Sequence, residues 1–153
     1  MWKYKNKVIN DIIDMPEDAI GFIYEVEHIP TGAKYIGKKV LFFERNVKIG
    51  KREVAKLKEE RKANGVGGRP ASKKKVIKES DWKEYYGSSE KMKTLVNGGE
   101  SADFDRTILQ FVSTKKLLTY YEAELLFRKD VLNDDTYIND NILAKFYRKD
   151  FSN

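Results

Sequence analysis

Two runs near the N-terminus combine alternating polar and apolar positions with residues that favour strands. They are "GFIYEVEHI" (21–29) and "AKYIGKKVLFF" (33–43), and the turn residues "PTG" (30–32) separate them. This pattern predicts a β-hairpin as the first element.

The side chains of this hairpin divide between two faces, because neighbouring residues of a strand point in opposite directions. If Thr31 and Gly32 form a two-residue loop, Lys39 lies opposite Tyr24 and both share a face with Tyr35. Two phenols and an ammonium on one face of a hairpin are typical of a functional site as well as of a packed core.

In the rest of the chain, segments with helical periodicity are separated by turn residues, and one further segment has a strand pattern. In order, it predicts a helix over 46–65, an exposed loop over 65–75, a short helix capped by Ser80, a helix over 88–99, a strand over 104–112 and a helix over 114–132. The order β-β-α-α-β-α predicts an α+β fold, with a small three-stranded antiparallel sheet flanked by helices.

Length and composition limit the class of protein. We expect one domain over residues 1–153, with an N-terminal extension over 1–18 and a basic insertion over 46–80. The chain has no cysteine, which excludes disulfides and thiolate metal sites, and no apolar run near the roughly 18 residues of a membrane span. We therefore expect a cytoplasmic protein, in a bacterial host if a phage encodes it.

The positive charge is concentrated in one segment. Residues 38–78 hold 15 Lys and Arg against 4 Asp and Glu, a net charge of +11, whereas the whole chain has a net charge of +6. Such a segment is typical of a contact with a polyanion, because lysine and arginine side chains that neutralise phosphates release condensed counterions. A solvated basic face that only keeps the protein soluble is the alternative.

The tyrosines belong to a wider set of motifs. "FIY" ends at Tyr24 and "YIG" begins at Tyr35, 11 positions later, and "DWKEYYGSSEKMKTLVNGGESADFDRTIL" and "YYEAELLFRKDVL…YIN" follow. Together they resemble the GIY-YIG nuclease family, with Phe22 in place of the first glycine. The small phage-encoded members, homing-type or free-standing endonucleases, are the most similar in these motifs.

The resemblance implies a metal-dependent endonuclease that hydrolyses phosphodiester bonds in double-stranded DNA. It implies one Mg²⁺ or Mn²⁺ per active site, held by a carboxylate and by phosphate oxygens, which suits a hard cation. It further implies that Tyr24 or Tyr35 acts as general base. One active site per chain leaves double-strand cutting to a homodimer or to sequential nicks.

The metal ligand that the resemblance implies is Glu122 or Glu124 in the last helix. In the family pattern, apolar residues follow the carboxylate three and four positions later, and Leu125 and Leu126 stand in these places after Glu122. We therefore select Glu122. Glu124 is spaced to pair with Arg128 one turn further on.

The family arginine has no clear counterpart. Arg45 has the expected spacing after Tyr35 for the first helix, but Ile49 stands where the pattern has His or Tyr. An alternative alignment places "DWKEYY" at that helix and gives the later role to Tyr85. Lys39, beside Tyr24 in the predicted hairpin, is a third candidate for this part of the site.

Two functions of other classes stay open. One is a nucleic-acid-binding module without catalysis, in which Trp82, Tyr85 and Tyr86 stack on bases. The other is a phage protein that interacts with a host factor, because a fold does not determine a function.

Overall fold

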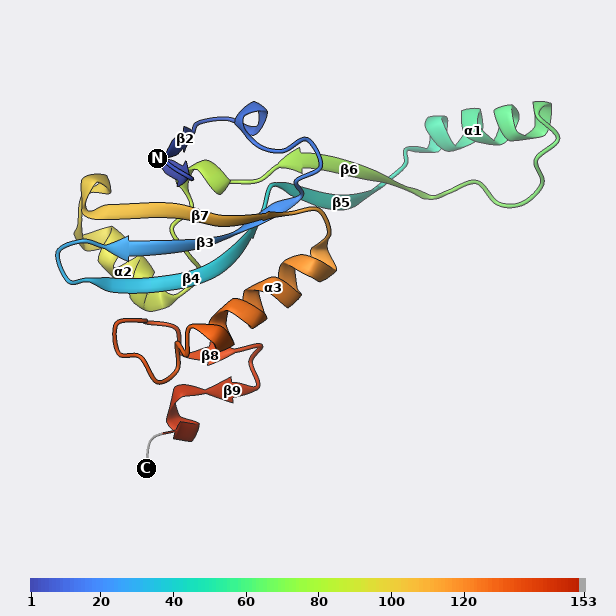
Figure 1. Cartoon of the computed structure of the whole chain (residues 1–153). Coiled ribbons are helices and arrows are strands. Elements are labelled where there is room, and N and C mark those ends of the chain that lie inside the picture. The colour runs from blue at the N-terminus through green and yellow to red at the C-terminus, as the bar shows by residue number, and fades with distance from the viewer. Residues whose placement is uncertain (152–153) are drawn as a thin grey trace. The chain divides into compact units, whose positions relative to one another are not determined.

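The computed structural model describes residues 1–151. The chain forms two compact units: unit 1 is Met1–Leu41 with Ser80–Asn153, and unit 2 is Phe42–Glu79. None of the helices in the described part of the chain has the length and apolar composition that a bilayer crossing requires. The elements of unit 1, drawn in Figure 1, are β1 (Trp2–Tyr4), β2 (Lys7–Ile9), η1 (Ile12–Asp14), β3 (Gly21–His28), β4 (Ala33–Val40), η2 (Trp82–Glu84), α2 (Glu90–Gly98), η3 (Ser101–Asp103), β7 (Phe104–Val112), α3 (Lys115–Arg128), β8 (Asn141–Ile142), β9 (Phe146–Tyr147) and η4 (Arg148–Phe151).

The sheet of unit 1 has five strands in the order β2-β1-β7-β3-β4, with β1 parallel to β7 and the other pairs antiparallel. The α+β class is confirmed, but the expected three-stranded antiparallel sheet is wrong. The two additional strands come from the N-terminal residues, which we had expected to be an extension. Trp2 explains their place, because its ring is buried and its indole Nε1 donates a hydrogen bond of 2.7 Å to the Trp82 carbonyl.

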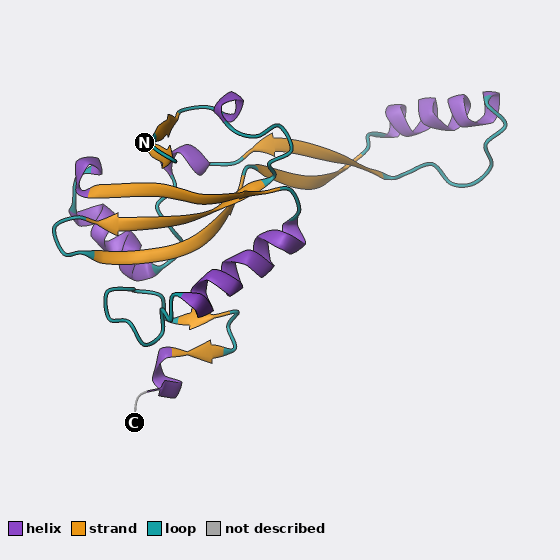
Figure 2. Ribbon diagram, viewed as in Figure 1, coloured by secondary structure: helices purple, strands orange, loops and turns teal. Residues whose placement is uncertain are grey.

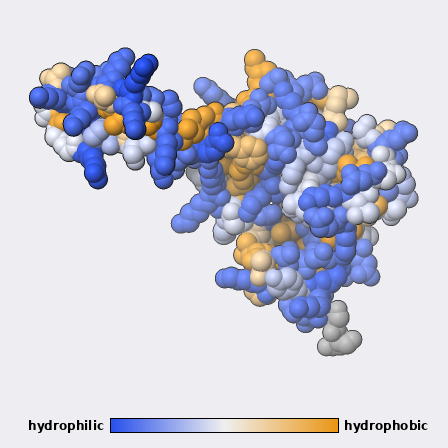
Figure 3. All heavy atoms as spheres, turned by 180° about the vertical axis from the view of Figure 1, so that it is seen from behind, coloured by the Kyte–Doolittle hydropathy of each residue, from blue (hydrophilic) through white to orange (hydrophobic). Residues whose placement is uncertain are grey.

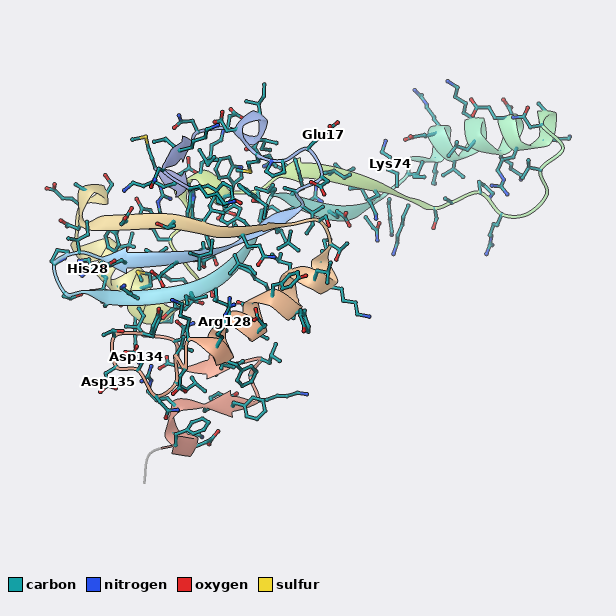
Figure 4. All side chains as sticks on the ribbon, in the orientation of Figure 1. Glu17, His28, Lys74, Arg128, Asp134 and Asp135 are labelled. Carbon is teal, nitrogen blue, oxygen red and sulfur yellow. The ribbon has the colours of Figure 1, made fainter. Side chains whose placement is uncertain are left out.

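The hairpin of β3 and β4 exists, but its loop has four residues rather than two. Tyr24 lies opposite Gly37 and Lys39 lies opposite Phe22, so the expected register, with Lys39 opposite Tyr24, is wrong. The loop closes through hydrogen bonds from Thr31 and Gly32 to the His28 carbonyl (His28 is labelled in Figure 4). The shift is by two residues, so each side chain keeps its predicted face.

Helix α3 covers one face of this sheet and residues 80–98 cover the other (Figure 2). The core under α3 includes Ile23 and Ile36, which point away from the face that carries Tyr24 and Tyr35. Helix α3 therefore packs on the face opposite to the one that carries Tyr24 and Tyr35. Leu125 and Leu126 anchor the helix in the core, as predicted.

The tyrosine face is covered by aromatic side chains. Trp82 packs on Phe22, and Tyr85 packs edge-on against Tyr24. The short helix predicted here is the single 3-10 turn η2, and Ser80 does not cap it. The Ser80 hydroxyl instead donates a hydrogen bond of 2.6 Å to the Val40 carbonyl.

Unit 2 is a two-stranded antiparallel ribbon with a helix between its strands. Its elements are β5 (Phe42–Lys48), α1 (Lys51–Ala63) and β6 (Lys73–Glu79). The predicted helix over 46–65 therefore begins five residues late, because 46–48 belong to β5, and the predicted loop over 65–75 gives up its last three residues to β6. Unit 2 contains no buried residue, and Figure 3 shows that hydrophilic side chains cover most of the face drawn.

Candidate active site

A pocket of about 580 Å³ lies in unit 1 beside β4, the edge strand of the sheet. On the side away from β3, residues 136–139 hydrogen-bond to β4 at Lys34 and Ile36, and side chains from both faces of β4 reach the pocket beside them. Tyr35 comes from one face of β4 and Lys38 from the other, and Glu122 of α3 joins them in the lining. The pocket therefore combines a phenol, an ammonium and a carboxylate.

Tyr35 is the motif tyrosine that lines this pocket. Its ring is half-buried, and its hydroxyl lies 3.0 Å from the Ser88 hydroxyl within hydrogen-bond distance. Gly87 supports the ring from behind: it has a φ of +131°, and a Cβ there would lie 3.1 Å from the Tyr35 ring. The segment 87–88 thus holds the phenol in place.

Tyr24 does not line the pocket. Its side chain is 1% exposed, and its ring lies 6.3 Å from that of Tyr35 and 5.9 Å from that of Tyr85. Gly37 lies directly under both motif tyrosines, since a Cβ there would lie 2.5 Å from the Tyr24 hydroxyl oxygen and 3.0 Å from Cε1 of Tyr35. The glycine of "YIG" is therefore required for the tyrosines to pack at this distance.

The environment of both phenols favours the protonated form. Burial raises the pKa of Tyr24 well above its usual value near 10, and the neighbouring Tyr35 and Tyr85 raise it further. Burial also raises the pKa of Tyr35, the hydrogen bond to Ser88 opposes this shift, and the charge of Glu122 adds to it. Both tyrosines are neutral at pH 7.

Glu122 and Glu124 differ clearly in their surroundings. The Glu122 side chain is 18% exposed and its carboxylate lies 2.9 Å from the Lys38 ammonium in the pocket. The Glu124 side chain is 41% exposed and pairs with Arg128 at 3.7 Å along the helix. The geometry therefore favours Glu122 as the functional carboxylate.

Lys39 and Tyr85 lie together on the covered face of the sheet. The Lys39 ammonium is 2.6 Å from the Asp81 carboxylate and 3.7 Å from the centre of the Tyr85 ring. The Lys39 side chain is only 8% exposed, and neither residue lines the pocket beside β4. These contacts favour a role in holding residues 81–85 against the sheet.

Arg45 lies in unit 2, whereas the other candidate residues lie in unit 1. It was expected on a helix but lies on strand β5, opposite Val76 of β6. The structure also bears on the alternative of a nucleic-acid-binding module, in which Trp82 was one of the residues expected to stack on bases. Trp82 is fully buried, so its ring cannot stack on a base.

Lys38 and Ser88 are pocket residues that the sequence reasoning did not select. The predicted hairpin places the site on the face of Tyr24 and Tyr35, to which Lys38 does not belong, whereas the pocket lies at the edge of the sheet. The signal was present in "YIGKK", which places two adjacent lysines on opposite faces. No local pattern singles out Ser88, which lies 53 positions after the tyrosine that it contacts.

Asn139 connects the C-terminal part of unit 1 to the edge strand. Its amide accepts a hydrogen bond of 3.1 Å from the Ile36 nitrogen and donates one of 2.8 Å to the Ile36 carbonyl. Arg148 holds the same segment by donating hydrogen bonds to the carbonyls of Val131, Tyr137 and Asn139, among others. Asn139 therefore fixes the wall of the pocket next to Tyr35.

Glu122 is the carboxylate of this pocket that could contribute to a metal site. Within residues 1–151, no group of three or more acidic or histidine side chains is arranged to hold a metal ion. Of the other carboxylates in the lining, Glu90 pairs with Lys93 at 2.6 Å and Asp140 with Lys91 at 2.7 Å. Glu122 is then the main protein side chain that could coordinate a metal ion in this pocket. Mg²⁺ commonly binds through one or two carboxylates, substrate phosphates and water.

Comparison with known families agrees with the motifs. The family model described as "Putative endonuclease segE, GIY-YIG domain" matches residues 2–142. Searches among curated proteins and among solved structures gave no match. The match covers most of the chain, including every residue that lines the pocket except Leu143, and it confirms the resemblance.

Proposed function

The chain belongs to the GIY-YIG family, and from this premise we propose that it is a metal-dependent DNA endonuclease with its active site in the pocket beside β4. The observation that carries the proposal is the meeting of Tyr35, Lys38 and Glu122 in one pocket, although Glu122 lies more than 80 positions further along the chain. These three side chains supply a general base, a cation and a metal ligand, which together meet the needs of phosphodiester hydrolysis.

Glu122 is the residue that would hold Mg²⁺ or Mn²⁺, which supplies Lewis-acid activation of the scissile phosphate when bound. The Lys38 ammonium, 2.9 Å away, balances the charge of Glu122 in the protein alone. The same ammonium would donate hydrogen bonds to the oxygens of a phosphate bound in the pocket. Lys38 then takes the place of the family arginine and stabilises the charge that develops there.

Tyr35 is positioned to accept the proton of the attacking water. Its raised pKa opposes this role in the protein alone, and the negative charge of Glu122 is one of the causes. The Ser88 hydroxyl opposes the raised Tyr35 pKa, because its hydrogen bond stabilises the phenolate. Tyr24, which is buried behind Tyr35, keeps the ring in position.

The proposal is tested by cleavage of supercoiled plasmid DNA with Mg²⁺ or Mn²⁺, for the parent, Glu122→Gln and Glu124→Gln, with EDTA as the blank. Glu122→Gln keeps the shape of the side chain and removes its charge, so cleavage should fall by at least about 10³-fold, equivalent to about 4 kcal/mol. DNA binding should persist or strengthen, because a negative charge near the phosphates is lost.

Glu124→Gln is the matched control on the same helix and should keep most of the activity, because Glu124 only pairs with Arg128. Activity lost at Glu124 and kept at Glu122 would show that the helix alignment is wrong by two residues. Full activity in both variants would refute a mechanism that depends on this carboxylate.

A further inference from the structure

Unit 2 is a compact unit whose composition differs from that of unit 1. Both of its connections lie at one place in unit 1, where the Ser80 nitrogen donates a hydrogen bond of 2.8 Å to the Leu41 carbonyl. It holds 13 Lys and Arg against 5 Asp and Glu, a net charge of +8, without one buried residue. An element with so much charge and no core is built to contact something outside its own chain.

The charges of α1 are separated around the helix axis. At about 100° per residue, Lys51, Lys58 and Lys62 lie within about 40° of one another. Glu53 and Glu60 lie on the opposite side, about 180° to 200° from Lys51. We call Lys51, Lys58 and Lys62 the lysine row.

The lysine row is open to a large partner. All three side chains are exposed. Ala55, which is also exposed, lies between Lys51 and Lys58 along the helix, about 40° from Lys51 around its axis. Among residues 1–151, none of the three lysines forms an ion pair, whereas Glu53 on the far side pairs with Lys74 (labelled in Figure 4) at 3.1 Å. A small residue between cations lets another surface approach the helix closely.

We propose that α1 is a binding helix for duplex DNA and that the lysine row contacts the phosphates at the major groove. The groove of B-form DNA is about 12 Å wide and admits an α-helix. The major groove of A-form RNA is deep and narrow, so the same helix cannot enter it. The choice of DNA as the ligand rests on the proposed function. The geometry and exposure of the lysine row do not depend on that proposal.

The lack of a core in unit 2 predicts how α1 behaves. A helix of 13 residues without buried side chains is close to the length at which isolated helices are marginal in water. Contacts between the lysine row and phosphates stabilise the helical state relative to the free chain. Backbone amides of α1 should therefore exchange hydrogen rapidly in the free protein and become protected when DNA is added.

The test compares two double variants of the whole protein: Lys58→Gln with Lys62→Gln, and Arg52→Gln with Lys56→Gln as the control. Each removes two positive charges from α1, and glutamine has nearly the helix propensity of lysine and arginine. Binding to a 30-bp DNA duplex is measured in EDTA, where no cleavage occurs, over a range of salt concentrations. The lysine-row variant should lower the slope of log K against log salt by about 2 and weaken binding about tenfold at moderate salt.

The control variant should change the slope by less than half as much. Equal losses in the two variants would mean that only total charge matters, and no loss in either would mean that α1 does not contact DNA; both results overturn the proposal. Equal affinity and an equal slope loss on duplex RNA of the same sequence would overturn the choice of DNA.

The two proposals fail separately in these experiments. The binding test needs no metal and no catalysis, and the control variant Glu124→Gln should show the salt slope of the parent. A parent that does not cut plasmid but shows the predicted slopes would refute the nuclease alone. A parent that cuts but whose slope does not depend on the lysine row would refute the binding helix alone.

Discussion

The two units of this protein are stabilised in different ways. Every buried side chain of the described chain lies in unit 1, whose 17 Lys and Arg and 19 Asp and Glu leave a net charge of −2. Unit 2 has a net charge of +8, no buried side chain, and ladder and helix hydrogen bonds as its main internal contacts. Burial of apolar area stabilises the first, whereas the second depends on backbone hydrogen bonds and local propensity.

This difference matches the two tasks that we propose. Precise chemistry needs side chains held within fractions of an ångström, and only a packed core such as that around Tyr24 and Gly37 holds them so closely. Attraction to a polyanion needs charge rather than exact position, so it does not require a core. The separation of the two units can be tested by changes that affect one of them at a time.

The largest expected effect is on the stability of unit 1. Trp2→Ala removes a fully buried ring and its hydrogen bond to the Trp82 carbonyl, and should lower the free energy of unfolding by about 3–5 kcal/mol. Leu57→Ala, on half-buried α1 surface of unit 2, should change it by less than about 0.5 kcal/mol. All nine tyrosines and both tryptophans lie outside residues 42–79, so intrinsic fluorescence during urea unfolding follows unit 1 alone. Equal losses for the two variants would show that unit 2 contributes to the same core.

A smaller effect is expected when unit 2 is removed. Residues 42–79 can be replaced by a two-residue Asn-Gly turn, because Leu41 and Ser80 already share a backbone hydrogen bond. The variant should keep the unfolding midpoint of unit 1 and cut plasmid at low salt. Its affinity for duplex DNA at physiological salt should fall by at least about 100-fold, because a net charge of +8 is lost. A variant that binds as tightly as the parent would place the DNA contact in unit 1.

The smallest expected effect is in the alkaline pH range. Burial raises the pKa of Tyr137 to about 12 and that of Tyr24 well above 10, while unfolded tyrosines titrate near 10. The folded state therefore holds protons that the unfolded state releases. The stabilisation is complete below about pH 10 and is lost as the pH rises towards 12. Urea unfolding followed by fluorescence should show this decline in the parent and a shallower decline in Tyr24→Phe. A decline of equal slope in both would mean that Tyr24 does not contribute to it.

Local pattern was sufficient for several elements and for part of the site. The strand over 104–112 matches β7 residue for residue, and the predicted helix over 114–132 contains α3, with Thr114 as its N-cap. The spacing of Leu125 and Leu126 indicated which glutamate faces inward, because a helix with two adjacent buried residues has one inner side. Each of these predictions uses residues within one or two turns of one another.

The exposed, basic character of unit 2 was predictable for the same reason. A run of lysines, arginines and good helix formers needs no distant partner to indicate an exposed basic helix. The side on which each lysine lies followed only from the structure. In β6, Lys74 lies on one face of the ribbon and Lys73 and Lys75 on the other, because neighbouring side chains of a strand point to opposite faces.

The strand order of the sheet and the lining of the pocket could not be predicted from the sequence, because they depend on contacts between residues far apart in the chain. The five-stranded sheet requires Trp2 to meet Trp82, and the wall of the pocket requires Asn139 to meet Ile36, 103 positions away. Lys38 rather than Lys39 lines the pocket because side chains of both faces of β4, the edge strand, reach it. The sequence by itself determined the first hairpin, the strand over 104–112, the helix over 114–132, the motif residues and the location of the charge, since these follow from local periodicity and composition. The N-terminal strands, the ribbon of β5 and β6, the strand order and the side chains that meet in the pocket depend on pairing and packing between distant residues, which no local pattern contains.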